Sequence, residues 1–259
     1  MTIAVILAGG VGQRMKMSLP KQFVKVLDVP VIIYTLKIFQ AHPEIDAIEI
    51  VTVSSFIEEV NSYSSQYNIS KLKWITNGGD NFQRSVYNGV MNLNGVCSND
   101  DIIMLAMSVS PLITSDIISD SLRICKQYGN AVAGDYSIYN LSRIQDNYWA
   151  QNYILKEEHF TLNMPWTFPF EKLLWAYSKA YSNSFGMDDR SYTTTLMIDL
   201  GEKLYFSKDS QANKLKLTTV EDLDMLEGFL LLHEIRKGNI EAINKIRMNK
   251  LNRTRRVHK

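Results

Sequence analysis

The feature that most constrains the fold is a regular alternation of short β-branched runs with longer segments of helical periodicity. We expect strands at residues 3–7, 47–53, 72–76, 101–109, 131–136 and 203–207. Between and after them, apolar residues recur every three or four positions and predict helices near 31–39, 55–67, 82–90, 115–127 and from 218 onward. Such alternation is typical of an α/β protein with a mostly parallel sheet and helices on both faces.

Two segments interrupt this alternation. Residues 139–163 contain polar residues and scattered aromatics without a clear period, and such a long excursion is usually functional or an interaction element. Between Lys245 and Lys259 there are seven Lys/Arg and no Asp/Glu. We therefore predict one domain over residues 1–237 and a basic C-terminal extension at 238–259. The extension is either a solvated terminus or a contact for a nucleotide, a membrane surface or a following domain.

Charge and composition exclude several classes of protein. Without the seven tail cations, 21 Lys/Arg stand against 27 Asp/Glu, so we expect no binding to nucleic acid. No apolar run reaches the roughly 18 residues that span a membrane, and no basic segment precedes the first apolar run as in a secretory signal. Cys97 and Cys125 are too few for a disulfide framework or a four-cysteine zinc site. We expect a cytoplasmic protein with two buried thiols.

The segment with the clearest chemistry follows the first predicted strand. Leu7-Ala-Gly-Gly-Val-Gly-Gln-Arg-Met15 is followed by Leu19-Pro-Lys-Gln-Phe23. Glycines after a strand let backbone N–H groups converge on an anion. Arg14 and Lys21 would add two cations suited to a triphosphate. The segment is neither a Walker loop, because no Gly-Lys-Ser/Thr follows, nor a dinucleotide fingerprint, because Met15 replaces the third glycine.

These motifs resemble the sugar-nucleotide pyrophosphorylase superfamily, and within it the CTP-dependent cytidylyltransferases of the methylerythritol-phosphate and ribitol-5-phosphate type. The likeness continues through residues 30–39, 78–86, 165–168 and 213–223, and therefore spans nearly the whole chain in order. The sequence Leu19-Pro-Lys-Gln-Phe23 and the Ser-Val pair shortly before Pro111 favour the ribitol-phosphate branch. The resemblance implies a Rossmann-like nucleotidyltransferase domain and a homodimer, with a protruding dimerisation arm at about residues 139–163.

The resemblance also implies roles for individual residues. It assigns charge stabilisation at the reacting phosphate to Arg14, Lys21 and Lys216. The nucleotide-binding residues that it implies are Leu7, Ala8, Gly9, Gly10, Gly12, Gly79, Asp80 and Ser85. On the acceptor side it implies Lys156, supplied by the neighbouring subunit, together with Trp166 and Asp188. The substrates would be CTP and a small polyol phosphate, with ribitol 5-phosphate favoured, and the expected cofactor would be Mg²⁺.

The departures from the family pattern fall on positions that the family uses for chemistry. The pattern His-Asp-x-x-Arg-Pro is Ala106-Met-Ser-Val-Ser-Pro111 here, so Met107 replaces the metal-holding aspartate and Ser110 replaces the arginine. Phe82 replaces another arginine, and a Thr-Pro-Gln motif reads Met164-Pro-Trp166. Methionine does not ligate Mg²⁺, which demands hard oxygen donors. Two hypotheses stay open: an active transferase with altered metal handling, or a catalytically degenerate homologue that binds nucleotide or a partner without turnover.

Three tryptophans and one pair of aspartates have structural as well as functional interpretations. Trp74 and Trp175 fit strand and helix patterns, and we expect them in the core. Trp166 either stacks on a substrate or fills the acceptor pocket. Asp188-Asp189 is not expected to form a metal pair, because adjacent carboxylates in a strand point to opposite faces. The pair either caps the following turn or orders the acceptor side.

Overall fold

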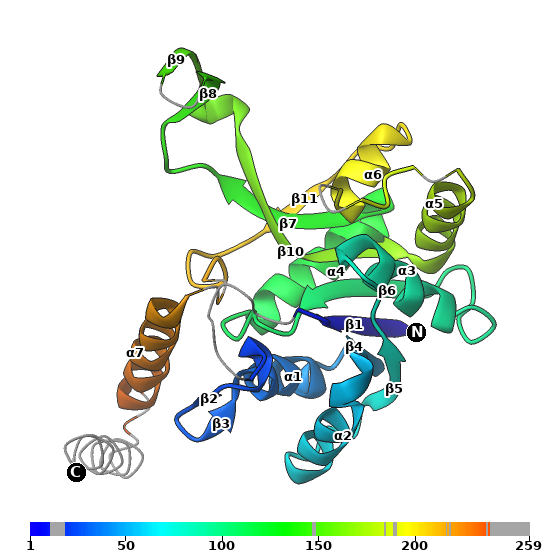
Figure 1. Ribbon diagram of the computed structural model, residues 1–259, viewed down its shortest axis with the longest axis vertical. Helices are drawn as coiled ribbons and strands as arrows, with labels where there is room; N and C mark the ends of the chain where they lie inside the picture. The colour runs from blue at the N-terminus through cyan, green and yellow to red at the C-terminus, as the bar shows by residue number, and fades with distance from the viewer. Residues whose placement is uncertain are drawn as a thin grey trace.

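The computed structural model confirms an α/β architecture around one seven-stranded sheet (Figure 1). The structure describes residues 1–10, 19–146, 149–183, 185–188, 191–215, 217, 219–236 and 238. The strands of this sheet are β1 (Thr2–Ala8), β4 (Ala47–Thr52), β5 (Leu72–Asn77), β6 (Ile102–Met107), β7 (Ala131–Tyr136), β10 (Phe160–Pro169) and β11 (Phe206–Lys208). Their order is β11-β7-β10-β6-β1-β4-β5, and every neighbouring pair is parallel except those of β10, which runs antiparallel to β6 and β7.

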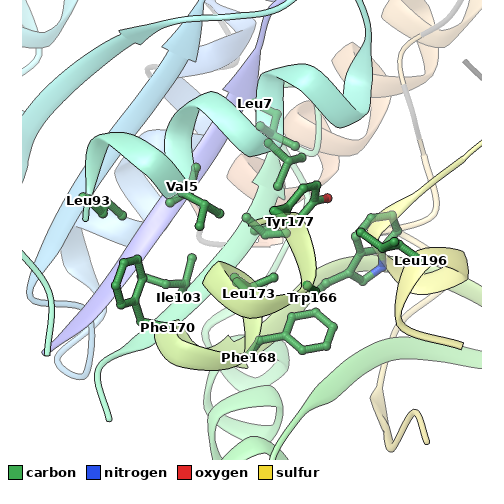
Figure 2. Packing of buried hydrophobic residues seen from close by; sticks show 14 of the residues in the cluster. Val5, Leu7, Leu93, Ile103, Trp166, Phe168, Phe170, Leu173, Tyr177 and Leu196 are labelled. Carbon is green, nitrogen blue, oxygen red and sulfur yellow. The ribbon is translucent and has the colours of Figure 1, made fainter. Parts of the chain in front are cut away.

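Helices cover both faces of the sheet. They are α1 (Val31–Ala41), α2 (Ile57–Gln66), α3 (Phe82–Asn92), α4 (Ser115–Tyr128), α5 (Phe170–Ser182) and α6 (Thr193–Asp199). The last helix, α7 (Val220–Arg236), packs against the short strand β2 (Lys25–Val26) instead. Side chains alternate along β1, so Val5 packs in the layer of α3, α5 and α6, whereas Ile6 packs in the layer of α1, α2 and α4. Figure 2 shows part of the first layer, in which Trp166 lies beside Leu196. Because both faces are covered, every residue of β1 is buried.

Local sequence signals set the ends of the helix that follows β6. The Oγ1 of Thr114 accepts a hydrogen bond from the N–H of Ile117 at 3.4 Å, which caps the start of α4. The helix ends at Gly129, whose φ of 87° lies in the left-handed region that glycine adopts most readily. Its N–H donates to the carbonyl of Cys125 at 2.8 Å. The two signals give α4 a defined length and fix the entry into β7.

The segment at 139–163 is more regular than its sequence predicts. It contains β8 (Leu141–Asp146) and β9 (Trp149–Ile154), which pair antiparallel, then the short 3₁₀ helix η4 (Lys156–Glu158) and the start of β10. The hairpin of β8 and β9 extends away from the central sheet (Figure 1). β9 is almost entirely exposed, so no buried face imposes the alternation by which a strand is recognised. The predicted strands therefore did not include this hairpin.

The central strand β10 is absent from the predicted strands. Pro165 and Pro169 lie within it, and proline usually argues against a central strand. The structure accommodates Pro165 at an irregularity between Asn163 and Trp166, where the register of β10 against β7 shifts.

Two strand positions also differ from the prediction. β6 occupies 102–107 rather than 101–109, and β11 begins at Phe206 rather than at residue 203.

The two tryptophans that were expected in the core differ in their burial. Trp74 is half-buried and packs against the core, but Trp175 is 40% exposed, which contradicts the prediction. α5 turns Leu173, Ala176 and Tyr177 inward, so Trp175 falls on its outer face. There the Nζ of Lys179 lies 5.5 Å from its ring centroid.

Both cysteines are free thiols, as the sequence predicts, although only Cys125 is buried and Cys97 is half-buried. Burial raises the pKa of Cys97 to about 11 and that of Cys125 to about 12. Over the described part of the chain, no helix combines the length and the apolar character needed to cross a bilayer. The predicted basic extension lies outside the described residues except for Gly238.

Candidate active site

The candidate site lies where β1, β4 and β5 end, since the carboxyl ends of parallel strands commonly form ligand sites. β1 ends at Ala8, whose carbonyl accepts hydrogen bonds from Gln22 Nε2 at 2.7 Å and from Thr52 Oγ1 at 3.4 Å. Gly78, just after β5, donates its N–H to the carbonyl of Thr52 at 2.7 Å. These bonds tie the start of the glycine loop to the ends of two neighbouring strands.

Ser85 joins the glycine loop to the turn that precedes α3. Its Oγ accepts a hydrogen bond from the N–H of Gly79 at 3.1 Å and donates to the carbonyl of Asn81 at 2.8 Å. A Cβ on Gly9 would lie 3.5 Å from the same Oγ. A Cβ on Gly79 would clash with Arg84, so this turn requires glycine. The structure therefore brings together Gly9, Gly79 and Ser85, three of the predicted nucleotide-binding residues.

The other predicted nucleotide-binding residues fall into three groups. Leu7 and Ala8 have side chains buried in the core, so only their backbone can face a ligand. Gly10 and Asp80 are exposed at the same edge of the sheet. Gly12, and with it the predicted catalytic Arg14, lies outside the described residues.

Lys21 connects two distant parts of the chain at this site. It begins a short 3₁₀ helix, η2 (Lys21–Phe23), and its Nζ donates a hydrogen bond to the carbonyl of Leu217 at 2.8 Å. Leu217 is fully buried and lies next to Lys216 in the sequence. Lys216 itself lies outside the described residues. The predicted phosphate-binding lysine thus contacts the backbone of the segment that carries the other predicted catalytic lysine.

A cavity of about 810 Å³ opens between the end of β6, β10, the start of α3, α6, α7 and the loop before α7. The positions at which the sequence departs from the family pattern gather on its walls. Five of them line it: Phe82, Met107, Ser110, Met164 and Trp166. Ala106, which replaces the family histidine, is buried in the core and does not line the cavity. Substitutions that are scattered along the sequence therefore change one continuous surface.

Trp166 forms part of the cavity wall. It is 7% exposed and packs edge-on against Phe82 and Tyr192, with ring centroids 5.8 Å and 6.4 Å away. Phe82 and Tyr192 also contact each other, with centroids 5.4 Å apart. The Nε1 of Trp166 is buried and has no hydrogen-bond partner among the described residues. The three rings make one side of the cavity rigid and aromatic.

A hydrogen-bond network holds the loop after β11 against β10. The Nδ2 of Asn213 donates to Asp209 Oδ1 at 2.7 Å and to the carbonyl of Met164 at 2.9 Å. The Nδ2 of Asn163 donates to the other carboxylate oxygen of Asp209 at 3.1 Å. The next residue, Lys214, lines the cavity. Sequence reasoning missed these residues as site residues, and the only signal was that Asn213 and Lys214 open the last segment that resembles the family.

Two predicted acceptor-side residues do not line this cavity. Lys156 lies on η4, beside the β8–β9 hairpin, and its side chain is exposed. Asp188 is exposed in the loop before α6, where its Oδ1 accepts a hydrogen bond from Ser191 Oγ at 2.8 Å. This bond agrees with the interpretation that Asp188 caps the turn, whereas Asp189 lies outside the described residues.

The end of β6 does not suit a magnesium ion. Mg²⁺ prefers oxygen ligands from carboxylates, but Met107 offers a thioether at this position. None of the described residues that line the cavity is an Asp or Glu, and the described chain contains no cluster of three His, Cys, Asp or Glu side chains placed to hold a metal. The described residues at this end of the sheet do not fit the expected cofactor.

Comparisons with known proteins agree with this architecture. The solved 2-C-methyl-D-erythritol 4-phosphate cytidylyltransferase of Francisella tularensis superposes with a TM-score of 0.72 at 22% identity, covering 87% of this chain and 97% of that one. The 4-diphosphocytidyl-2C-methyl-D-erythritol synthase of Anaerococcus prevotii also gives 0.72, at 17% identity, and covers 89% and 98%. At such identities these structures support the fold alone.

Relatives found by sequence comparison are more similar to this chain than these solved structures are. The ribitol-5-phosphate cytidylyltransferase of Lacticaseibacillus paracasei is 37% identical over 235 residues, which cover 91% of this chain and 100% of the relative. The 2-C-methyl-D-erythritol 4-phosphate cytidylyltransferase of Clostridium botulinum type A is 32% identical over 226 residues, covering 87% and 96%. The family model for 2-C-methyl-D-erythritol 4-phosphate cytidylyltransferase (IspD) matches residues 2–231. The chain belongs to the IspD family of cytidylyltransferases.

Proposed function

We propose that this protein transfers CMP from CTP to a small polyol phosphate in the cytoplasm and releases pyrophosphate, with ribitol 5-phosphate as the favoured acceptor. The observation that carries the proposal is the hydrogen bond from Lys21 to Leu217, which joins the phosphate-binding segment to the loop beside the cavity. The ribitol-5-phosphate cytidylyltransferase that is 37% identical supports the choice of acceptor.

The reaction asks the protein for positioning and charge stabilisation. A phosphate oxygen of the acceptor attacks the α-phosphorus of CTP in line, and the bond to pyrophosphate breaks. Negative charge that develops on the phosphates is stabilised by backbone N–H groups of the glycine loop and by Lys21. The turn at Gly79 and Ser85 holds the nucleoside end of CTP. The cavity beside Met107 holds the acceptor.

The alternative function is nucleotide binding without turnover. Its support is the set of apolar or small residues on the cavity wall, above all Met107 and Ser110. Pyrophosphate release separates the two functions when the protein is incubated with CTP, Mg²⁺ and ribitol 5-phosphate. Turnover that depends on the acceptor supports the transferase. Calorimetric binding of CTP without release of pyrophosphate from any polyol phosphate supports the alternative.

Restoring the family residues at the end of β6 is expected to raise activity. In a Met107→Asp, Ser110→Arg double variant, the carboxylate supplies an oxygen ligand for Mg²⁺, and the arginine keeps that carboxylate ionised. Stabilising charge in the transition state has large effects, so we expect a gain of about tenfold or more in Mg²⁺-dependent pyrophosphate release. Met107→Leu, which keeps the wall apolar, is the control. A native rate of about 1 s⁻¹ or faster, with no gain in the double variant, would show that Met107 is not a defect.

The exposed β8–β9 hairpin supports the proposal of a homodimer. Ile144, Trp149 and Tyr153 are 73%, 54% and 76% exposed, and clustered exposure of large apolar side chains usually marks an interface. We expect light scattering at tens of micromolar to report about twice the chain mass of 29.7 kDa. A Trp149→Ser, Tyr153→Ser variant is expected to shift the mass toward the monomer. A native mass near 29.7 kDa at that concentration contradicts the dimer.

A further inference from the structure

Lys214 is the one Lys or Arg among the described residues that line the cavity. Its side chain is 21% exposed, so it is largely shielded from solvent. The neighbouring Asn213 is 2% exposed and bonded to both Asp209 and the carbonyl of Met164, which fixes the backbone that carries Lys214. The long side chain of Lys214 therefore starts from a fixed backbone at the cavity wall.

The contact of Lys214 with Asp135 leaves the ammonium group able to donate further hydrogen bonds. Its Nζ lies 3.4 Å from Asp135 Oδ2, and Gln211 Nε2 lies 3.4 Å from the same oxygen. Charge-assisted bonds between ammonium and carboxylate are usually about 2.7–2.9 Å long. An ammonium group also has three donors, and this contact uses one of them. Asp135 is 44% exposed, so solvent weakens its attraction for Lys214 further.

A phosphorylated acceptor brings about two negative charges into a cavity whose described lining contains one cation, Lys214. Two arginines that the family resemblance implies are Ser110 and Phe82 here, and Lys156 lies on η4 away from the cavity lining. We propose that Lys214 binds the phosphate of the acceptor within its own subunit. The inference rests on the proposed function insofar as the acceptor is a polyol phosphate. Thr161 and Thr194 line the same cavity.

The test compares binding of ribitol 5-phosphate with binding of ribitol, by calorimetry, and adds the KM for ribitol 5-phosphate. Lys214→Gln removes the charge and is expected to weaken ribitol 5-phosphate about 10- to 100-fold, as for loss of a bond to a charged group. Ribitol, which lacks the phosphate, is not weakened, and the affinity for CTP is unchanged. Lys214→Arg is expected to restore binding to within a few-fold of the native protein.

Two further variants separate binding from a merely structural ion pair. Asp135→Asn breaks the same ion pair but leaves the cation, so it does not weaken ribitol 5-phosphate if Lys214 binds the phosphate. A structural ion pair predicts instead that Asp135→Asn and Lys214→Gln act alike. Lys208→Gln is the matched control, because Lys208 lies just before the same loop, pairs with Asp116 at 3.6 Å and does not line the cavity.

Each outcome decides one of the two proposals. Unchanged binding and KM for ribitol 5-phosphate in Lys214→Gln, or no phosphate-dependent binding to the native protein in either measurement, overturns the role of Lys214. If Lys214→Gln fails in this way while the native protein turns over CTP with ribitol 5-phosphate, the proposed function stands. If the native protein binds ribitol 5-phosphate through Lys214 but releases no pyrophosphate, the proposed function fails and the role of Lys214 stands.

Discussion

A Lys21→Gln variant is expected to lose about 100- to 1000-fold in kcat/KM for CTP, the usual effect of removing a group that stabilises charge in the transition state. Lys21 follows the glycine loop in the sequence, and its Nζ donates a hydrogen bond to the carbonyl of Leu217 at 2.8 Å. In the proposed mechanism, the substitution therefore removes a cation from the phosphates, and it also removes the hydrogen bond to the segment beside the cavity.

Steady-state kinetics with CTP varied at saturating ribitol 5-phosphate measures this loss. Lys21→Arg keeps a charge and donors to the carbonyl, so we expect it to retain more activity than Lys21→Gln. Lys25→Gln is the matched control, because Lys25 is exposed on the neighbouring short strand β2 (Lys25–Val26). A Lys21→Gln variant within threefold of the native kcat/KM, with unchanged thermal stability, would remove Lys21 from the mechanism.

A Glu49→Gln variant is expected to be more stable than the native protein at pH 8.5, by about 3 kcal/mol. Glu49 is fully buried on β4. Its Oε1 accepts hydrogen bonds from Thr76 Oγ1 at 2.5 Å and Asn92 Nδ2 at 3.0 Å, while Oε2 has no partner among the described residues. Burial raises the pKa of Glu49 from 4.5 to about 7, although those two hydrogen bonds act in the opposite direction.

The sign of the pH dependence follows from this shift. Because the native pKa lies above the unfolded value of 4.5, the protonated carboxyl group favours the folded state, and this contribution is lost as pH rises through about 7. Glutamine resembles the protonated form at every pH. The free energy of unfolding, measured in urea, should therefore differ little between native protein and variant at pH 5 and most at pH 8.5. Glu58→Gln, at an exposed site on α2, is the control.

A difference between Glu49→Gln and the native protein that is the same at pH 5 and pH 8.5 would contradict this account. It would mean that Glu49 does not change its protonation between those two values in the folded protein. The strand prediction for residues 47–53 did not identify this carboxyl group as unusual. Only the packing of α3 and β5 over β4 shows that Glu49 is closed off from water.

The sequence predicted elements whose pattern reflects burial. β1 has both faces covered and reads as an unbroken apolar run, and α4 carries its cap and its terminal glycine in the sequence. β10 could not be recognised in this way, because its prolines argue against a strand and its position between β6 and β7 depends on long-range pairing. The β8–β9 hairpin lacks a buried face and so carries no alternation.

The candidate site also contains some residues that the sequence could predict and others that it could not. Gly79 and Ser85 could be recognised from a motif, and the turn's requirement for glycine now has a physical reason in the clash with Arg84. The loop at Asp209 and Asn213 could not, because its partner Asn163 is brought near only by β10. Nor does the sequence show that five of the departures from the family pattern line one cavity, since that follows from the pairing of β10 with β6 and from the contact of Phe82 with Trp166.

The most direct test of cytidylyl transfer is product analysis after incubation with CTP, Mg²⁺ and ribitol 5-phosphate. Mass spectrometry is expected to detect CDP-ribitol, and a coupled assay is expected to detect pyrophosphate in equal amount, with neither product formed when ribitol 5-phosphate or CTP is left out. Absence of both products from folded protein that binds CTP, across ribitol 5-phosphate and other polyol phosphates, would contradict the account and identify the chain as a nucleotide-binding member of its family.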